Sequence, residues 1–178
     1  MYDQFKRKIN YLRISVTDRC NLRCEYCMPA EGVESMCHED ILRFDEIVEF
    51  TKLAVEQGID KVRITGGEPL VRKGIVNLIN SLSEIDGIKD LAMTTNGILL
   101  DRFAQDLLSA GLNRVNVSLD TMDPTKFSNI TRGGDIKDVF KGIEAAKTAG
   151  LTPIKLNCVI SKSSNEPDAQ AVKKYAEL

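Results

Sequence analysis

Hydrophobic and polar positions along the chain repeat one unit, in which a helical period, a glycine and an alternating segment follow one another. The glycines are Gly58, Gly87, Gly111 and Gly150, each followed by Ile or Leu and two spacer residues. This order predicts a helix that ends near a glycine in the left-handed conformation and then a strand. Before Gly58, for example, the helical period is formed by Ile47, Phe50 and Ala54.

A first strand near residues 12–16 and a last helix after Pro167 bring the total to about five strand–helix units. Strands that alternate with helices form a parallel sheet with right-handed crossovers. The fold class is therefore α/β. Five units are too few for a closed eight-unit barrel, so we expect an open, curved partial (βα) barrel, with a doubly wound sheet as the alternative.

The strands alternate strictly, unlike parallel strands that are covered on both faces. Leu12, Ile14 and Val16, for instance, oppose Arg13, Ser15 and Thr17. One sheet face is thus predicted to be apolar and packed by helices. The other face carries the polar residues Arg13, Arg63, Thr94, Asn116, Ser118, Lys155 and Asn157.

Three cations on one strand face would be costly in a dry core, so this face is expected to line a polar cavity. The alternative is a sheet face that is simply open to water. The sequence is interpreted as having no acidic residues at these strand positions. A face that is merely solvated would carry both positive and negative side chains, so this absence argues against the alternative. A net-positive lining favours an anionic ligand, such as a phosphorylated compound.

Composition and charge narrow the function classes. The net charge of −2 over 178 residues gives no overall attraction to nucleic acid or to an anionic membrane. No apolar run is long enough to span a membrane, and the N-terminus lacks the apolar stretch of a secretory signal. We therefore predict a cytoplasmic protein without nucleic-acid or membrane partners.

Three of the five cysteines, Cys20, Cys24 and Cys27, lie on the segment that follows the first predicted strand. A structural zinc ion usually has four protein ligands, and an electron-transfer [4Fe–4S] cluster usually has four cysteines. Three thiolates would leave one iron open for a substrate to chelate. A zinc site that adds Cys37 or His38 as the fourth ligand is the alternative.

The spacing Cys20-x3-Cys24-x2-Cys27, with Tyr26 before the last cysteine, resembles the signature of the radical S-adenosylmethionine superfamily. The segment Gly66-Gly-Glu-Pro69 after the second strand resembles that superfamily's Gly-Gly-Glu-Pro motif. Its glycines would allow a close backbone approach to a ligand. The resemblance implies a [4Fe–4S] cluster whose open iron binds S-adenosylmethionine, and a 5′-deoxyadenosyl radical as the reactive species.

Several further runs resemble the GTP 3′,8-cyclase family, the lyases of the first step of molybdenum cofactor biosynthesis. They are Leu12 to Cys20, Arg63 to Leu70, Thr94-Thr-Asn-Gly97, Asn116-Val-Ser-Leu-Asp120 and Lys155-Leu-Asn. The resemblance implies that Arg13, Arg63, Thr94 and Lys155 bind GTP, which is rearranged to a cyclic purine nucleotide. It likewise implies that Tyr26, Gly67 and Ser118 bind S-adenosylmethionine.

Members of that family are nearly twice as long as this chain and carry a second three-cysteine cluster in the part beyond. We therefore expect residues 1–178 to be an incomplete radical S-adenosylmethionine core domain that does not turn over GTP alone. The resemblance also implies a flavodoxin- or ferredoxin-like electron donor, and we include a homodimer among the expected partners. The open alternatives are a related enzyme with another substrate and a non-catalytic metal-binding module.

One glycine-rich segment has no role in this scheme. Arg132-Gly-Gly-Asp135 follows the helix predicted to start at Asp123-Pro124. It is interpreted as a flexible connection, with contact to a phosphate as the alternative.

Overall fold

The computed structural model describes residues 2–34, 40–162 and 165–177, and its strands form one parallel sheet. The strand order follows the chain, β1-β2-β3-β4-β5. This singly wound order is that of an open partial (βα) barrel, and the alternative of a doubly wound sheet is wrong. The strands are β1 (Tyr11–Ser15), β2 (Lys61–Thr65), β3 (Asp90–Thr95), β4 (Arg114–Ser118) and β5 (Lys155–Asn157).

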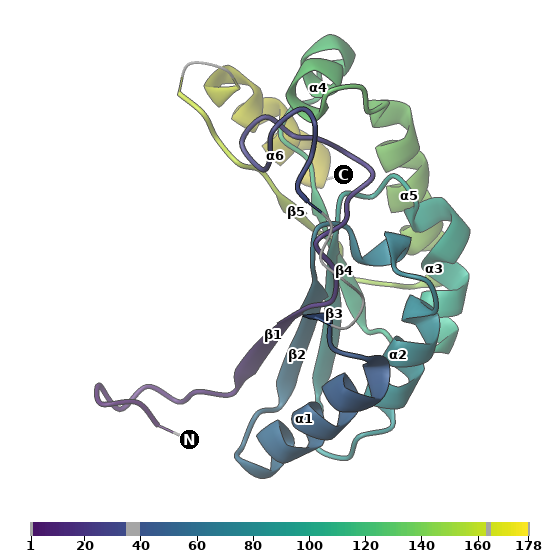
Figure 1. The fold of residues 1–178 in the computed structure, drawn as a ribbon. Helices are drawn as coiled ribbons and strands as arrows, with labels where there is room; N and C mark the ends of the chain where they lie inside the picture. Colours follow the sequence, from purple (N-terminus) through teal and green to yellow (C-terminus); the bar gives the residue numbers. More distant parts are fainter. Residues whose placement is uncertain (1, 35–39, 163–164, 178) are drawn as a thin grey trace.

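Helices run along the outer side of the curved sheet, and the N-terminal segment and the loop after β1 lie toward the other side (Figure 1). Two helices, α4 and α5, connect β4 to β5. The α-helices are α1 (Phe44–Glu56), α2 (Ile75–Ser83), α3 (Leu100–Ser109), α4 (Pro124–Thr131), α5 (Ile136–Ala149) and α6 (Ala169–Ala176). Short 3₁₀ helices, η2 (Pro69–Val71) and η3 (Glu166–Asp168), precede α2 and α6.

The core lies between the sheet and the outer helices, as the alternation predicts. The apolar strand residues there are almost completely buried: Val62, Ile64, Leu91, Met93, Val115 and Val117. They pack with the inner faces of the helices, including Leu78 of α2 and Leu107 of α3. Burial of such side chains stabilises the fold by about 1.5–3 kcal/mol each, which explains why one face of every strand is apolar.

All four predicted glycines have a positive φ, but α2 already ends at Ser83, four residues before Gly87. Gly150 is the C-cap of α5 in the left-handed conformation, with φ +99°. Gly58 also has a positive φ and follows the C-cap of α1. Phe50, however, belongs to the apolar period of α1 and is 56% exposed, whereas the buried residues of this helix are Ile47 and Thr51. Phe50, three residues after Ile47, points away from the sheet. Thr51, four residues after Ile47, faces the core instead.

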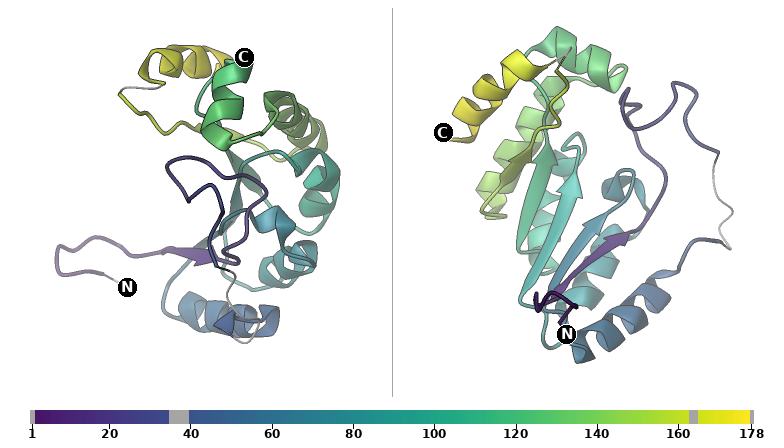
Figure 2. Two further views of the ribbon diagram at one scale, coloured as in Figure 1. Left: turned by 45° about the horizontal axis from the view of Figure 1, so that its top comes forward. Right: turned by 90° about the vertical axis from the view of Figure 1, so that its left-hand side faces the viewer.

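The carboxyl ends of the strands meet at one edge of the sheet (Figure 2). The cysteine-bearing loop leaves β1 there, and the Gly66–Pro69 segment leaves β2 beside it. Parallel α/β folds place their sites at this edge. Within the described residues, no helix is long and apolar enough to cross a membrane.

Candidate metal centre and active site

The loop after β1 brings the three predicted cluster ligands into one compact turn. The backbone N–H groups of Cys27 and Met28 donate to the carbonyl oxygen of Cys24 at 2.9 and 3.2 Å. Cys20 and Cys24 are half-buried and Cys27 is exposed. Burial raises the pKa of all three thiols, that of Cys24 to about 12, and neighbouring cysteines add to the increase at Cys24 and Cys27. Coordination by a metal would remove these protons.

The surroundings of Cys20 fit an iron–sulfur centre. The backbone N–H of Leu22 lies 3.4 Å from the Cys20 sulfur, and Nδ2 of Asn96 lies 3.8 Å from it. Such donors stabilise a thiolate ligand. In the part of the chain that the structure describes, no three His, Cys, Asp or Glu side chains form a site for a single metal ion. A cluster spreads its thiolate ligands over separate irons, so three cysteines suit it without meeting at one point. Cys37 and His38, the candidate fourth zinc ligands, lie outside the described residues.

Gly66 and Gly67 allow the second motif to pack directly against the backbone of the cysteine loop. The Gly67 N–H donates to the Thr17 carbonyl at 2.6 Å, and the Glu68 N–H donates to the Arg19 carbonyl at 2.8 Å. A Cβ at position 67 would lie 2.3 Å from the Arg19 carbonyl oxygen, and one at position 66 would lie 2.7 Å from that of Thr17. The close approach expected for a ligand is therefore already made by the loop before Cys20.

Glu68 is fully buried and joins the ends of β2 and β3. Its Oε1 accepts from the Leu70 N–H at 3.0 Å and from the Thr95 hydroxyl at 2.8 Å, while its Oε2 accepts from the Asn96 N–H at 2.7 Å. Burial raises the pKa of Glu68, and these three donors oppose that increase. Both carboxylate oxygens are thus engaged by the protein itself, and the side chain orders the strand ends around Cys20.

Tyr26 is tied to the far end of the sheet through Asp120, which follows β4. The Tyr26 hydroxyl donates to Oδ2 of Asp120 at 2.5 Å, and Oδ1 of Asp120 accepts from the Val159 N–H at 2.8 Å. Asn165 completes this corner, because its Nδ2 donates to the carbonyl oxygens of Asp120 and Val159 at 2.7 and 2.8 Å. Burial and the bond to Asp120 raise the pKa of Tyr26. The corner therefore connects the cysteine loop with the loops after β4 and β5, near the half-buried Ser118 at the end of β4.

The sequence pattern does not predict the roles of Asp120 and Asn165 at this corner. Asp120 is the last residue of one of the runs that resemble the GTP 3′,8-cyclase family, but that resemblance assigns it no role. Asn165 stands alone in a polar loop, and nothing in its spacing indicates a buried position. The role of Asn96 could have been found, because this residue directly follows β3 at the carboxyl edge of the sheet, two residues after Thr94, and its side chain reaches Cys20.

The predicted GTP residues lie in adjacent rows on the polar face of the sheet. Arg13 is in register with Arg63, and Thr94 is in register with Asn116, which itself faces Lys155. Arg13 and Lys155 are exposed, whereas Arg63 is half-buried. Nε of Arg63 is buried without a hydrogen-bond partner. A buried donor left unpaired on a polar face is available to a ligand.

The interpretation that this face lacks acidic residues is wrong. Asp90, the first residue of β3, shares the parity of Thr94 and forms a double hydrogen bond with Arg114, with donor–acceptor distances of 3.0 and 2.6 Å. Nη1 of Arg114 also donates to Oδ1 of Asn116 at 3.0 Å. This carboxylate therefore neutralises Arg114, a further cation on the same face. The positive charge of Arg13, Arg63 and Lys155 is left in place.

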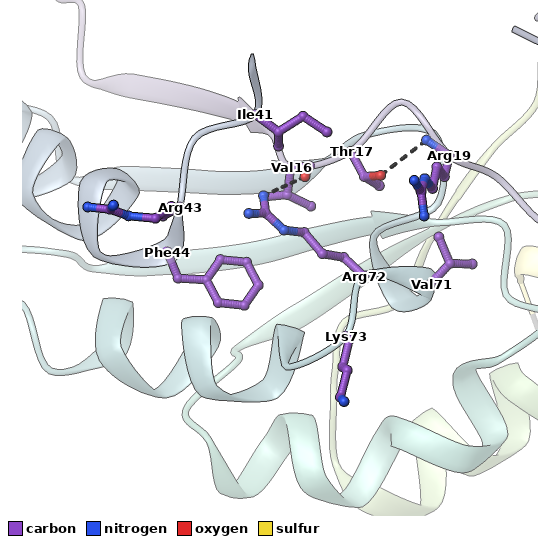
Figure 3. Close-up of a pocket in the computed structure, with 9 residues that line it drawn as sticks. All are labelled: Val16, Thr17, Arg19, Ile41, Arg43, Phe44, Val71, Arg72 and Lys73. Carbon is purple, nitrogen blue, oxygen red and sulfur yellow. Dashed lines mark hydrogen bonds between the residues drawn. The ribbon is translucent and has the colours of Figure 1, made fainter. Parts of the chain in front are cut away.

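Two neighbouring cavities adjoin the cysteine loop. One, of about 520 Å³, lies between the end of β1, the start of α1 and the segment after β2, and includes the cations Arg19 and Lys73 (Figure 3). There Arg72 donates to the carbonyl of Val16 at 2.6 Å and lies over the ring of Phe44 at 4.2 Å. The second, of about 420 Å³, is lined by Cys20 together with Asp18, Arg19, Arg23, Met28 and Val33. The structure thus leaves room directly beside Cys20.

Comparison with solved structures supports the fold. The structure of HydG, a maturase of the [FeFe]-hydrogenase, superposes with a TM-score of 0.73 at 14% identity, covering 94% of this chain and 39% of that one. Methylornithine synthase superposes with a TM-score of 0.72 at 16% identity, covering 92% of this chain and 50% of that one. At these identities the likeness concerns the fold alone.

Curated relatives are far more similar in sequence. A protein named GTP 3′,8-cyclase from Thermodesulfovibrio yellowstonii is 56% identical over 171 residues, which are 96% of this chain and 53% of the relative. Another of that name, from Moorella thermoacetica, is 54% identical over 168 residues, or 94% and 52% of the two chains. The chain thus spans about half the length of these relatives. The sequence profile of the Radical SAM superfamily matches residues 14–176. This match agrees with the cysteine loop and with the singly wound sheet, and the chain belongs to the radical SAM superfamily.

Proposed function

We propose that this chain is the cluster- and S-adenosylmethionine-binding part of a GTP 3′,8-cyclase, a lyase that acts in molybdenum cofactor biosynthesis. The observation that carries the proposal is the packing of the cysteine loop against Gly66–Glu68, at the edge of a sheet face that presents Arg13, Arg63 and Lys155. Identity above 50% to proteins of that name, over nearly the whole chain, supports it. Residues 1–178 then form an incomplete core domain.

Cys20, Cys24 and Cys27 would hold a [4Fe–4S] cluster, and Tyr26, Gly67 and Ser118 would contact S-adenosylmethionine. When bound, the reduced cluster supplies the electron that cleaves the sulfonium group. The chain's own contribution is to orient these groups. Gly67 and Glu68 fix the start of the cysteine loop, while Asp120 holds the hydroxyl of Tyr26 and so positions the backbone around it.

Arg13, Arg63, Thr94 and Lys155 would bind GTP. Arg13 and Arg63, in register on adjacent strands, suit the phosphates of a nucleotide, and Lys155 on β5 adds a third cation to the same face. Charged hydrogen bonds to phosphate oxygens are among the strong ones. The unpaired Nε of Arg63 and the exposed Lys155 support this assignment. The nucleotide would then lie on the polar face of the sheet, next to the edge formed by the carboxyl ends of the strands, where the cofactor would bind.

Anaerobic reconstitution of the 178-residue chain with iron and sulfide tests the cluster. We expect bound iron and sulfide, an EPR signal of the reduced cluster that changes when S-adenosylmethionine is added, and formation of 5′-deoxyadenosine. Cys24→Ala should abolish iron retention because it removes a thiolate ligand. Cys158→Ala is the matched control, since that half-buried cysteine lies after β5, outside the loop, and should retain iron. Stoichiometric zinc without iron or sulfide would instead establish a zinc-binding module.

GTP binding tests the substrate. Arg13→Met and Lys155→Met should each weaken GTP binding about tenfold or more, because each removes one charged hydrogen bond to phosphate. Calorimetry on the reconstituted chain measures the effect. Lys52→Met on the outer helix α1 removes the same charge, paired there with Glu49, and should leave affinity unchanged. Equal affinities for all variants would favour a radical SAM enzyme with another substrate.

The remaining partner assignments stay predictions. A flavodoxin- or ferredoxin-like protein would supply the electron, and the chain would form a homodimer. Free thiols at Cys20, Cys24, Cys27 and Cys158 support a reducing, cytoplasmic location.

A further inference from the structure

We propose that Arg132 is a positioning residue for the metal centre. Its side chain clamps the segment that carries Cys24 and Cys27. The inference rests on the proposed function, because it assigns that segment to a cluster. Arg132 follows α4 and lies more than one hundred residues from the cysteines in sequence. The end of α4 contacts the cysteine loop through backbone hydrogen bonds, and Figure 1 shows the position of this helix in the fold.

The clamp consists of one nitrogen atom that closes a short loop. Nη1 of Arg132 donates to the carbonyl oxygen of Arg23 at 2.9 Å and to that of Met28 at 2.8 Å. Arg23 immediately precedes Cys24, and Met28 immediately follows Cys27. The two ends of the ligand-bearing segment are therefore held to one another through a single planar cation.

The last turn of α4 supports the same segment through its backbone. The N–H groups of Arg23 and Glu25 donate to the carbonyl oxygens of Thr131 and Ile130 at 3.2 and 2.9 Å. Carbonyl groups at the end of a helix lack partners within the helix, so the cysteine loop supplies their donors. A Cβ on Gly134 would lie 3.0 Å from Leu22 Cδ2. The end of α4 thus fits the loop closely, so the segment that begins at Arg132 also supports the cysteine loop in addition to connecting two helices.

The backbone conformation at position 132 indicates that the arginine is there for its side chain. Arg132 has φ +54° and ψ +54°, in the left-handed region, where glycine is favoured over a residue with a Cβ. Two glycines follow it directly in the chain. The local backbone alone would therefore favour glycine at this position. The side chain is explained by the two carbonyl groups that it binds.

The experiment compares Arg132→Gly and Arg132→Asn with the parent chain. Both replacements suit a left-handed backbone, so neither introduces backbone strain, and both remove the clamp. After anaerobic reconstitution with iron and sulfide, we expect iron release to a chelator to be about tenfold faster in both, as loss of two hydrogen bonds implies. Arg132→Lys, which keeps a cationic donor, should be intermediate. Lys6→Gly is the matched control, since Lys6 also has a positive φ and lies in the N-terminal turn.

A second readout needs no metal. In the apo chain, amide hydrogen exchange at Arg23 and Glu25 should be about tenfold faster in Arg132→Gly than in the parent, while the thermal midpoint stays within the range of Lys6→Gly. Parent-like exchange and parent-like iron release in Arg132→Gly would overturn the proposal, as would a fall in the thermal midpoint that accounts for both. A parent chain that takes up no iron would contradict the proposed function, and the exchange rates would still decide whether Arg132 clamps the loop.

Discussion

Replacing Gly67 with alanine is expected to displace the loop that carries Cys20 and to reduce cluster retention sharply. The added Cβ would lie 2.3 Å from the Arg19 carbonyl oxygen and 2.8 Å from that of Asp18. These are backbone atoms, so no side chain can rotate away. The same two segments are joined by short backbone hydrogen bonds from Gly67 to Thr17 and from Glu68 to Arg19, and these bonds would be strained or broken. Overpacking of this kind costs about 1–3 kcal/mol.

The measurements are the denaturant midpoint of the apo chain and the iron retained after reconstitution. Gly150→Ala is the matched control. Its φ of +99° strains an alanine, but the nearest atom to its Cβ is a side-chain carbon at 3.8 Å, in Leu108, far from the cysteines in the chain. It should lower stability by about 1–2 kcal/mol from strain in the left-handed conformation and leave iron retention intact. If Gly67→Ala keeps its iron as well as this control does, the close packing is not required for the site.

Replacing Glu68 with glutamine is expected to destabilise the chain although the two side chains have nearly the same shape. The carboxylate accepts three hydrogen bonds on its two oxygens. A glutamine amide presents one acceptor and one donor, so its NH₂ group must face the N–H of either Leu70 or Asn96. A buried donor without a partner costs about 1–3 kcal/mol, and the Asn96 side chain near Cys20 would shift with its backbone.

Urea denaturation measures this loss, and the Cys20 environment is followed by the EPR signal of the reconstituted chain. Glu49→Gln on the exposed surface of α1 makes the same chemical change, loses a single surface ion pair with Lys52, and should cost less than about 1 kcal/mol. Equal stability of Glu68→Gln and Glu49→Gln would contradict the assignment of Glu68 as the link between β2 and β3.

The repeated pattern of the sequence determined the elements and the two faces of the sheet. Period and parity are local properties of a chain, and they correctly assigned Val62 and Ile64 to the core and Arg63 to the polar face. They failed at Phe50, where a helical period includes a residue that points to solvent. They also failed at Asp90, the first residue of β3, which shares the parity of Thr94 and places a carboxylate on the polar face.

The candidate ligands were likewise local, because Cys20, Cys24 and Cys27 follow one strand within a single loop. Their surroundings were not local. Gly67 contacts that loop because β1 and β2 are neighbours whose carboxyl ends coincide. A close approach can be inferred from paired glycines, but the partner depends on strand order and register.

The sequence by itself thus determined the strand–helix repeat, the polar face and the three thiols of this protein. The tertiary structure decided which distant loops hold those thiols in place. Tyr26 meets Asp120 across 94 residues, and Arg132 meets Arg23 across 109 residues. Such contacts arise only after the sheet has brought the loops at its carboxyl edge together. No periodicity encodes them, because each depends on the geometry of several strands at once.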